Sequence, residues 1–259
     1  MALRTTAQSK EAGRAPLPLN SRQDTWWIRP LLTVIVLGSF VIYATWRAVE
    51  NRFFEVGPYL SPFYSPLLPI DLGIGGWRIS PALYILVFPL SFRLTCYYYR
   101  LAYYRAFFWD PPACAVQELS ARKHYTGERE FPFILQNLHR FAFYTAVIFI
   151  FILSYDAIRA FIFDGRFGVG LGSLIFVVNI VLLVLYTFSC HSFRHLIGGG
   201  LNCYSCSNAN KTRYGIWNRV SSLNARHGLF AWCSLFSVAL TDLYVRLVAS
   251  GTLRDVRFL

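Results

Sequence analysis

The chain has 259 residues, of which 55% are hydrophobic and 18% aromatic but only 15% charged. Soluble domains carry about a quarter charged residues, which excludes an ordinary soluble protein, and the apolar content is too high for a disordered chain. The net charge of +12 is unusual for so apolar a sequence. A nucleic-acid binder would need its Lys and Arg on a polar surface that is almost absent here. We therefore predict a membrane protein, without a nucleic-acid partner, whose charges are concentrated on one side.

Five stretches are long and apolar enough to cross a bilayer, which takes about 20 residues. A run of this length must satisfy its backbone hydrogen bonds internally, so each stretch is predicted to be a helix. The expected fold class is all-α, a polytopic membrane protein with a five-helix transmembrane domain over residues 31–249, an N-terminal tail (1–30) and a C-terminal tail (250–259). The five predicted spans are 31–49, 79–99, 139–158, 172–192 and 229–248.

The distribution of Lys and Arg predicts the orientation of these spans. Residues 1–30, 93–140 and 194–226 together hold 17 of the 25 basic residues, so that one side of the membrane carries a net charge of +11 and the other +1. Cytoplasmic loops are enriched in Lys and Arg, so the N-terminus is expected in the cytoplasm and the C-terminus outside a bacterial plasma membrane. The Pro-rich segment 58–81 is interpreted as a connecting loop on the outer side.

Histidine and cysteine are rare, and most of them fall in the predicted cytoplasmic part of the chain. His191 and His195 are four residues apart, which places both imidazoles on one face of a helix. Three glycines at 198–200 are expected to end this helix and to let the backbone fold back. Cys203 and Cys206 follow as a CxxC pair, a spacing at which two thiolates can hold one metal atom.

Several kinds of site are compatible with this constellation. A disulfide between Cys203 and Cys206 is disfavoured, because the basic side faces a reducing compartment. A structural zinc ion would find two His and two Cys, and a Rieske-type [2Fe–2S] cluster uses the same set, with two Cys on one iron and two His on the other. Histidines that only hydrogen-bond between helices are the plainest alternative, but ionisable groups within membranes are usually functional, which favours metal or cofactor redox chemistry. A b-type haem would take two histidines from His139, His191, His195 and His227.

Three further groups of residues give weaker signals. Isolated cysteines without local partners are interpreted as small apolar fillers: Cys96, Cys114 and Cys233. Arginines interleaved with tyrosines are interpreted as contacts to lipid headgroups combined with a docking surface for an acidic partner protein: Arg93, Arg100 and Arg105. Polar residues before the last span form either a quinone-binding site or a simple amphipathic lead-in helix: Trp217, Ser222, Arg226 and His227.

Several motifs, in the same order, resemble the membrane-anchor subunit of actinobacterial succinate dehydrogenase. The resemblance covers about residues 79–248 and agrees with the five predicted spans. The N-terminal tail and the C-terminus do not contribute to it. The motifs are Phe92–Arg105 (FRLTCYYYRLAYYR), Asn137–Arg140 (NLHR), Ser189–Gly198 (SCHSFRHLIG), Leu223–His227 (LNARH) and Thr241–Tyr244 (TDLY).

The resemblance implies a subunit of respiratory complex II. A flavoprotein subunit would oxidise succinate, an iron–sulfur subunit would relay electrons, and this chain, without an FAD or succinate site of its own, would pass them to menaquinone or ubiquinone. Anchors of the wider family resemble one-haem or two-haem bundles, whereas the first two predicted spans here contain no histidine. A mycobacterial branch resembles this chain and implies a Rieske-type [2Fe–2S] cluster. The implied ligands are His191, His195, Cys203 and Cys206, with His139, His227 and Cys190 as substitutes.

Two other functions follow from the same residues. The chain is alternatively a haem b-bearing anchor of complex II or of a fumarate reductase, in which two histidines from different helices bind the iron. From a different class, it is a metal-binding membrane scaffold without electron transfer. Visible absorption separates the three, because a b-type haem, an iron–sulfur cluster and a zinc ion differ in colour.

Overall fold

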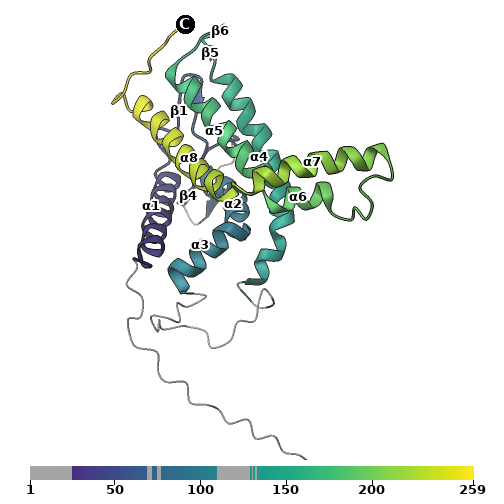
Figure 1. Cartoon of the computed structure of the whole chain (residues 1–259). Helices are drawn as coiled ribbons and strands as arrows, with labels where there is room; N and C mark the ends of the chain where they lie inside the picture. The colour runs from purple at the N-terminus through teal and green to yellow at the C-terminus, as the bar shows by residue number, and fades with distance from the viewer. Residues whose placement is uncertain (1–24, 69–71, 75–76, 110–128, 130, 132) are drawn as a thin grey trace, which may run out of the picture.

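The computed structural model describes residues 25–68, 72–74, 77–109, 129, 131 and 133–259 (Figure 1). Within this part of the chain the structure is helical, with three short β-hairpins that connect helices. The helices are α1 (Ile28–Glu50), α2 (Pro81–Thr95), α3 (Tyr97–Phe108), the 3-10 helix η3 (Phe133–Leu138), α4 (His139–Arg159), α5 (Leu171–Phe188), α6 (His191–Gly198), α7 (Asn208–Asn224) and α8 (His227–Ala249). The antiparallel strand pairs are β1 (Glu55–Val56) with β2 (Tyr59–Leu60), β3 (Leu72–Ile74) with β4 (Trp77–Ile79), and β5 (Ile162–Phe163) with β6 (Arg166–Phe167).

Four of the predicted spans are confirmed as helices long and apolar enough to cross a membrane: α1, η3 with α4, α5 and α8. The predicted span over 79–99 is not one continuous helix, because α2 ends at Thr95 and Cys96 is extended (ψ 126°) before α3 begins. The 15 residues of α2 measure about 22 Å, less than the ~30 Å hydrocarbon core. The expected count of five continuous spans is therefore not confirmed.

The interruption at Cys96 coincides with a change of composition. The helix before it, α2, is apolar, and α3 after it reads YYYRLAYYRAFF, a run of aromatic and basic residues. Both α2 and α3 pack along α1, which is long enough to be a span on its own. Together, α2 and α3 run beside α1 in the opposite direction (Figure 1). A similar interruption shortens the predicted span 172–192, because α5 ends at Phe188 and the extended Cys190 precedes α6.

One end of the bundle is closed by residues 51–68 and the C-terminal tail, and we call it the closed end. Asp242 on α8 is fully buried and accepts hydrogen bonds from the Tyr43 hydroxyl (2.6 Å), from Ser61 and from Arg246 Nε (2.8 Å). The loop residue Tyr64 is also fully buried. Since each buried charge has partners, the loop is fixed to the helices by polar contacts as well as by packing.

Two more carboxylates hold the closed end together. Asp255 in the C-terminal tail accepts hydrogen bonds from the hydroxyls of Tyr59 (2.7 Å) and Tyr244 (2.5 Å). Asp156 at the end of α4 accepts one from Ser65. The segment predicted as a connecting loop therefore contributes buried side chains to the core of this end.

Helices α6 and α7 form a hairpin that projects away from the bundle (Figure 1). The chain reverses between them at residues 199–207, where Gly200 has a positive φ of 76°. A side chain at Gly198 would collide with the Trp217 ring, since an added Cβ would lie 2.1 Å from it. Of the glycines predicted to end the helix, Gly200 therefore allows the turn and Gly198 allows α7 to approach α6 closely.

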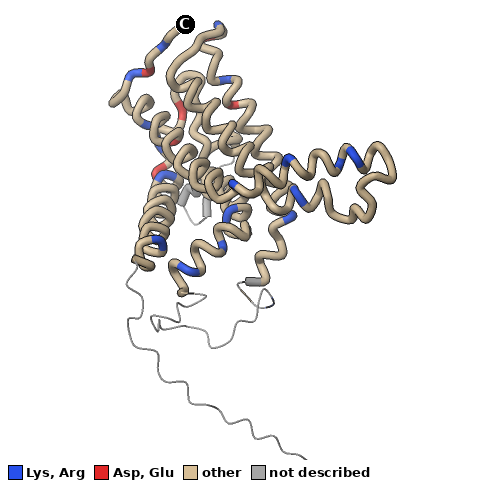
Figure 2. Tube along the Cα trace, viewed as in Figure 1, with Lys and Arg blue, Asp and Glu red and all other residues tan. Residues whose placement is uncertain are grey.

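Charged residues distinguish the two ends of the bundle (Figure 2). In the described part of the chain, every Asp and Glu lies toward the closed end: Glu50, Glu55, Asp156, Asp164, Asp242 and Asp255. The opposite end comprises residues 95–109, 133–140 and 189–228, and we call it the open end. Its described residues include Arg but no Asp or Glu. The predicted charge asymmetry is thus visible along the bundle.

Candidate functional site

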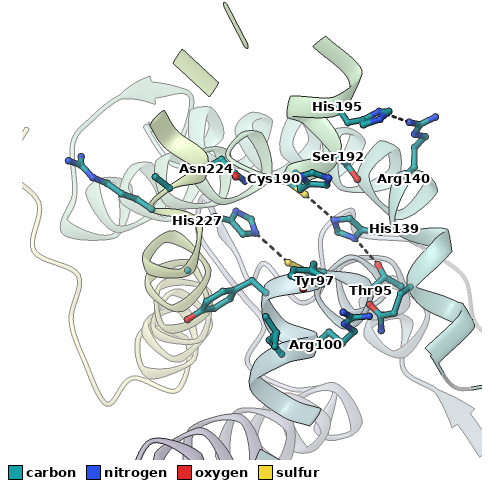
Figure 3. A pocket seen from close by; sticks show the side chains of 18 of the residues that line it. Thr95, Tyr97, Arg100, His139, Arg140, Cys190, Ser192, His195, Asn224 and His227 are labelled. Atoms are coloured by element: carbon teal, nitrogen blue, oxygen red, sulfur yellow. Dashed lines mark hydrogen bonds between the residues drawn. The ribbon is translucent and has the colours of Figure 1, made fainter. Parts of the chain in front are cut away.

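A cavity of about 1200 Å³ occupies the open end of the bundle (Figure 3). Four interruptions or starts of helices meet there: the α2–α3 break, the start of α4, the α5–α6 break and the start of α8. Each supplies one side chain with a soft nitrogen or sulfur atom, namely Cys96, His139, Cys190 and His227. The start of a helix is suited to this, because helix side chains tilt toward the N-terminus and the first residue has no preceding turn to cover.

His139 lies between a hydroxyl and a thiol (Figure 3). Its Nδ1 is 2.9 Å from Thr95 Oγ1, and its Nε2 is 2.9 Å from Cys190 Sγ. Thr95 already donates its hydroxyl proton to the Ser91 carbonyl (2.7 Å), so toward His139 it accepts. The imidazole therefore carries its proton on Nδ1, and an unprotonated Nε2 faces the thiol. Stacking on the Phe92 ring, with centroids 5.0 Å apart, fixes the ring plane.

His227 repeats this arrangement with other partners. Its Nδ1 lies 2.8 Å from Ser189 Oγ, and its Nε2 lies 3.3 Å from Cys96 Sγ. Ser189 Oγ also donates to the Tyr186 carbonyl (3.1 Å), so it too accepts from the imidazole. The His227 ring stacks on Tyr186 with centroids 5.1 Å apart. Both imidazoles thus have one nitrogen held by a hydroxyl and the other directed at a cysteine.

The two cysteines are buried, with exposed fractions of 2% for Cys96 and 1% for Cys190. Burial in an apolar surrounding and, to a smaller extent, the nearness of Cys96 raise the pKa of the Cys190 thiol to about 12. Without a metal the thiol is therefore protonated at neutral pH. A bound metal would deprotonate it, since thiolates rather than thiols are metal ligands.

Arg93 on α2 lies beside this cluster and is directed into the bundle. Its guanidinium donates to the Tyr99 hydroxyl (2.7 Å), the Ala231 carbonyl (3.3 Å) and Ser234 (3.2 Å), and it lies 4.7 Å from the Tyr186 ring centroid. No carboxylate pairs with it among residues 25–68, 77–109 and 133–259. Among these residues, the positive charge of Arg93 is met by hydroxyl and carbonyl dipoles and by aromatic rings.

The four ligands predicted from the sequence are not brought together around one point. The Cys203 and Cys206 thiols form a disulfide in the turn between α6 and α7, although the expected cytoplasmic location disfavoured one. The His191 and His195 rings have centroids 6.4 Å apart and line the wall of the cavity. No group of three or more His, Cys, Asp or Glu surrounds a single metal position in the described part of the chain.

His191 and His195 face positive charges. The pKa of His191 is lowered by partial burial and by the neighbouring charges of Arg194 and His195. His195 Nδ1 lies 3.0 Å from a guanidinium nitrogen of Arg140 (Figure 3). In contrast, the alternative ligands His139, His227 and Cys190 all belong to the group of four side chains that meet in the cavity, which we call the donor cluster.

The other predicted site residues are distributed over the open end. Among the residues predicted to bind quinone, Arg226 and His227 line the cavity, whereas Trp217 packs against α6 and the exposed Ser222 donates to a carbonyl of its own helix. Of the arginines predicted to dock a partner, Arg93 lies inside the bundle. The side chains of Arg100, which is 7% exposed, and of Arg105 lie over the rings of Tyr97 and Trp26, respectively.

Cys96 is the cluster residue that sequence reasoning missed, because it was interpreted as a filler. Its partner His227 is 131 residues away in the chain, and no local spacing connects the two. The available signal was the sharp change at Cys96 from an apolar segment to a run of Tyr and Arg. Such a change marks a helix interruption, which is where side chains from different helices meet.

These features define a helical membrane protein with a buried cluster of two thiols and two imidazoles at one end of the bundle. A family model described as actinobacterial succinate dehydrogenase subunit SdhC matches residues 28–251. The chain belongs to this family and is thus the membrane subunit of a succinate dehydrogenase complex, an oxidoreductase.

A solved structure supports the same assignment. The chain is similar to one in the Mycobacterium smegmatis Sdh1 complex in the apo form, with 47% sequence identity and a TM-score of 0.84. The match covers 96% of this chain and 97% of the other. No curated protein matches significantly. The resemblance stated from the motifs is therefore confirmed over nearly the whole chain.

Proposed function

We propose that this subunit carries electrons from a docked iron–sulfur subunit to quinone through a Rieske-type [2Fe–2S] cluster held by Cys96, Cys190, His139 and His227. The observation that carries the proposal is the convergence of these four donors from four helix ends, with both imidazoles held by hydroxyls. This ligand set replaces the one expected from the CxxC motif and keeps the expected chemistry. Bound there, the cluster would supply one-electron transfer inside the membrane subunit.

The donor set matches such a cluster in the kind and number of its residues. The Rieske type of [2Fe–2S] centre is held by two Cys and two His. Two thiols and two imidazoles are available in the cavity, as two Cys–His contacts of 2.9 and 3.3 Å rather than as one group around a point.

The surrounding hydrogen bonds also fit a metal site. Metal-binding histidines usually donate their second ring N–H to an oxygen, which fixes the tautomer and the ring orientation. Here Thr95 and Ser189 accept from Nδ1 of the two imidazoles, and Nε2 is left for a metal. The side chain of Asn224 binds the Ser189 carbonyl (2.7 Å) and ties the α5–α6 break to α7. These contacts hold the donors in place before any metal arrives.

Charge supports the direction of docking and insertion. The described residues of the open end include arginines and no carboxylate, which suits an acidic surface on a soluble partner and a cytoplasmic location. We place the flavoprotein and iron–sulfur subunits on this side, with the N-terminus in the cytoplasm and the C-terminus outside. Electrons from the iron–sulfur subunit would then enter this chain at the open end, where the donor cluster lies.

Metal analysis of purified complexes tests the proposal. Complexes with Cys190→Ser or His139→Ala should contain two fewer iron atoms and two fewer acid-labile sulfides than the unaltered complex. They should lack an EPR signal of low average g, and they should lose quinone reduction while still reducing a soluble dye with succinate. The matched control is His191→Ala, which removes an imidazole from the cavity wall and should retain iron, signal and quinone reduction.

Three outcomes would overturn it. Sharp b-haem absorption bands in the unaltered complex would favour the haem alternative. Zinc without extra iron would favour the metal-binding scaffold. Loss of the signal in His191→Ala, with retention in Cys190→Ser, would restore the ligands expected from the sequence.

A further inference from the structure

The CxxC motif at the tip of the α6–α7 hairpin has no part in the proposed function. Cys203 and Cys206 are bonded to each other in the turn, with their Cα atoms 5.7 Å apart. Cys206 is exposed and Cys203 is half-buried. The hairpin projects away from the bundle (Figure 1), so this disulfide lies outside the packed helices. A soluble molecule can therefore reach it without entering the bundle.

Other contacts already hold this turn in place. Asn210 Nδ2 donates to the Cys203 carbonyl (2.9 Å), and the Asn210 backbone N–H donates to Ser207 Oγ (3.1 Å) at the start of α7. The rings of Tyr204 and Tyr214 pack against each other with centroids 4.7 Å apart. A cross-link over so short a segment also restricts the unfolded chain little. The disulfide is thus not needed to build the hairpin, which favours a chemical role for the pair.

The surroundings of the motif match a reducing compartment. Residues 189–228 contain Lys and Arg but no Asp or Glu, which is typical of a cytoplasmic segment. The same positive charges attract an anionic thiolate. Thiols are kept reduced in the cytoplasm, and the disulfides that do form there are usually catalytic or redox-sensing. Exposed disulfides are also reduced more easily than buried structural ones. A disulfide at this place therefore has the properties of one that opens and closes.

We infer that Cys203 and Cys206 form a thiol–disulfide exchange site, at which soluble cytoplasmic thiols reduce the disulfide reversibly. The inference rests on the proposed cytoplasmic location of the open end and is independent of the proposed cluster.

The exchange transfers two electrons in two steps. A thiolate of the reductant attacks the more exposed Cys206 sulfur, so that a mixed disulfide forms, the bond to Cys203 breaks and the Cys203 sulfur takes up a proton. A second thiolate of the reductant then attacks the reductant's own sulfur in the mixed disulfide, and Cys206 is released and protonated. The two reductant sulfurs leave as a disulfide. The subunit has gained two electrons and two protons, and the reductant has lost them.

Redox equilibration of the purified complex tests the inference. After incubation in glutathione buffers with different ratios of the reduced to the oxidised form, free thiols are alkylated and counted by mass spectrometry. The tryptic peptide 195–211 contains both cysteines of the motif and no other cysteine. It should take up two alkyl groups at a ratio typical of the cytosol and none at a ratio typical of the secretory pathway. Cys233, a partly exposed cysteine on α8, is the internal control and should be alkylated equally in both buffers.

Single variants test the order of attack. Cys203→Ser leaves Cys206 as an unpaired thiol, and Cys206→Ser leaves Cys203 unpaired. The complex with Cys203→Ser should form a mixed disulfide with oxidised glutathione about tenfold faster than the complex with Cys206→Ser, because its remaining cysteine is more exposed. The opposite order would overturn the attack at Cys206. Iron content and EPR signal should be the same in the oxidised and the reduced complex.

A peptide 195–211 that stays a disulfide at the cytosolic ratio would overturn the inference, because the bond would then be a structural cross-link. A peptide that stays a dithiol at the oxidising ratio would also overturn it. Labelling of this peptide in intact cells by a membrane-impermeant maleimide would contradict the cytoplasmic location and the inference with it. An iron-containing complex whose peptide does not exchange contradicts the exchange site alone. A complex that exchanges but lacks the extra iron contradicts the proposed cluster alone.

Discussion

The two ends of this bundle use their buried polar residues differently. At the closed end each buried carboxylate is matched by hydroxyls or a guanidinium, as Asp242 is by Tyr43, Ser61 and Arg246. At the open end the buried groups are thiols and imidazoles that contact one another around a cavity of about 1200 Å³. Carboxylates with hydrogen-bond partners fill the closed end, whereas thiols and imidazoles line the cavity at the open end.

This difference in buried residues indicates that the closed end contributes mainly to stability and that the open end carries the candidate site. The closed end brings buried charges into close contact, a geometry that offsets the cost of removing them from water. At the open end, Arg93 contacts hydroxyls, a carbonyl and an aromatic ring, and the thiols of Cys96 and Cys190 contact imidazoles. Substitutions at the two ends should therefore have different consequences, which four sets of variants can reveal.

The largest effect is expected from Cys96→Ser. Serine keeps the size of the side chain but is a poor ligand for iron, so the complex should lose the proposed cluster entirely, with two fewer irons and no signal of low average g. Cys233→Ser is the matched control, because Cys233 is a partly exposed cysteine on α8 away from the donors. Iron analysis and EPR of the two complexes provide the measurement. Equal iron content in both complexes would show that Cys96 is not a ligand and only fills space in the core.

The second effect concerns the closed end. Asp242→Asn leaves the buried Arg246 guanidinium without its nearest negative partner and should destabilise the subunit by ~3–5 kcal/mol. Thermal unfolding in detergent measures this, and the iron content of the protein that stays folded should be normal. Asp164→Asn, at an exposed turn between β5 and β6, should shift the midpoint little. A similar shift in both variants would contradict a structural role specific to the buried pair.

The disulfide should have a smaller effect. A Cys203→Ser, Cys206→Ser double variant removes a cross-link that spans three positions of the chain, so the loss of stability should not exceed about 2 kcal/mol. Because both sulfurs lie in the α6–α7 turn, iron content and EPR spectrum should be those of the unaltered complex. Thermal unfolding and metal analysis of the same preparation decide this. Loss of iron would show that the CxxC motif binds the metal after all.

The smallest effect is expected from Arg93→Met. Reduction adds a negative charge to the proposed cluster, and a nearby guanidinium stabilises that charge, so the variant should have a lower reduction potential. A shift of about 60 mV corresponds to a tenfold change for one electron. An EPR-monitored redox titration measures it, with Arg93→Lys as the variant that keeps the charge. An unchanged potential in Arg93→Met would show that the guanidinium only supports Tyr99 and Ser234.

Much of the architecture was predictable, because a run of apolar residues imposes a helix in lipid regardless of its neighbours. The bounds of α1, α4 and α8 agree with the predicted spans within a few residues. The breaks at Cys96 and Cys190 were not predicted, since neither carries proline or glycine. At Cys96 the change from an apolar segment to one rich in Tyr and Arg was a local signal, whereas the conformation of each break depends on packing between helices.

The sequence predicted that two His and two Cys would form the site, but it did not predict which His and Cys residues come together. His191, His195, Cys203 and Cys206 have an attractive local spacing, whereas the residues that converge are far apart in the sequence. The family resemblance correctly indicated the kind of protein. Local spacing does not reveal which His meets which Cys, because that contact is created by helices that pack only after all of them are inserted.

The four donors come from the α2–α3 break, α4, the α5–α6 break and α8, and this has a consequence for biogenesis. His227 enters the bilayer with the last helix, so the donor set is complete only after the entire chain has been synthesised and inserted. Of the buried carboxylate contacts described at the closed end, only the one between Asp156 and Ser65 can form before then, because Asp242 lies on α8 and Asp255 follows it. Loading of the proposed cluster would therefore follow the insertion of α8, and in a cell limited in iron the inserted subunit would remain without it.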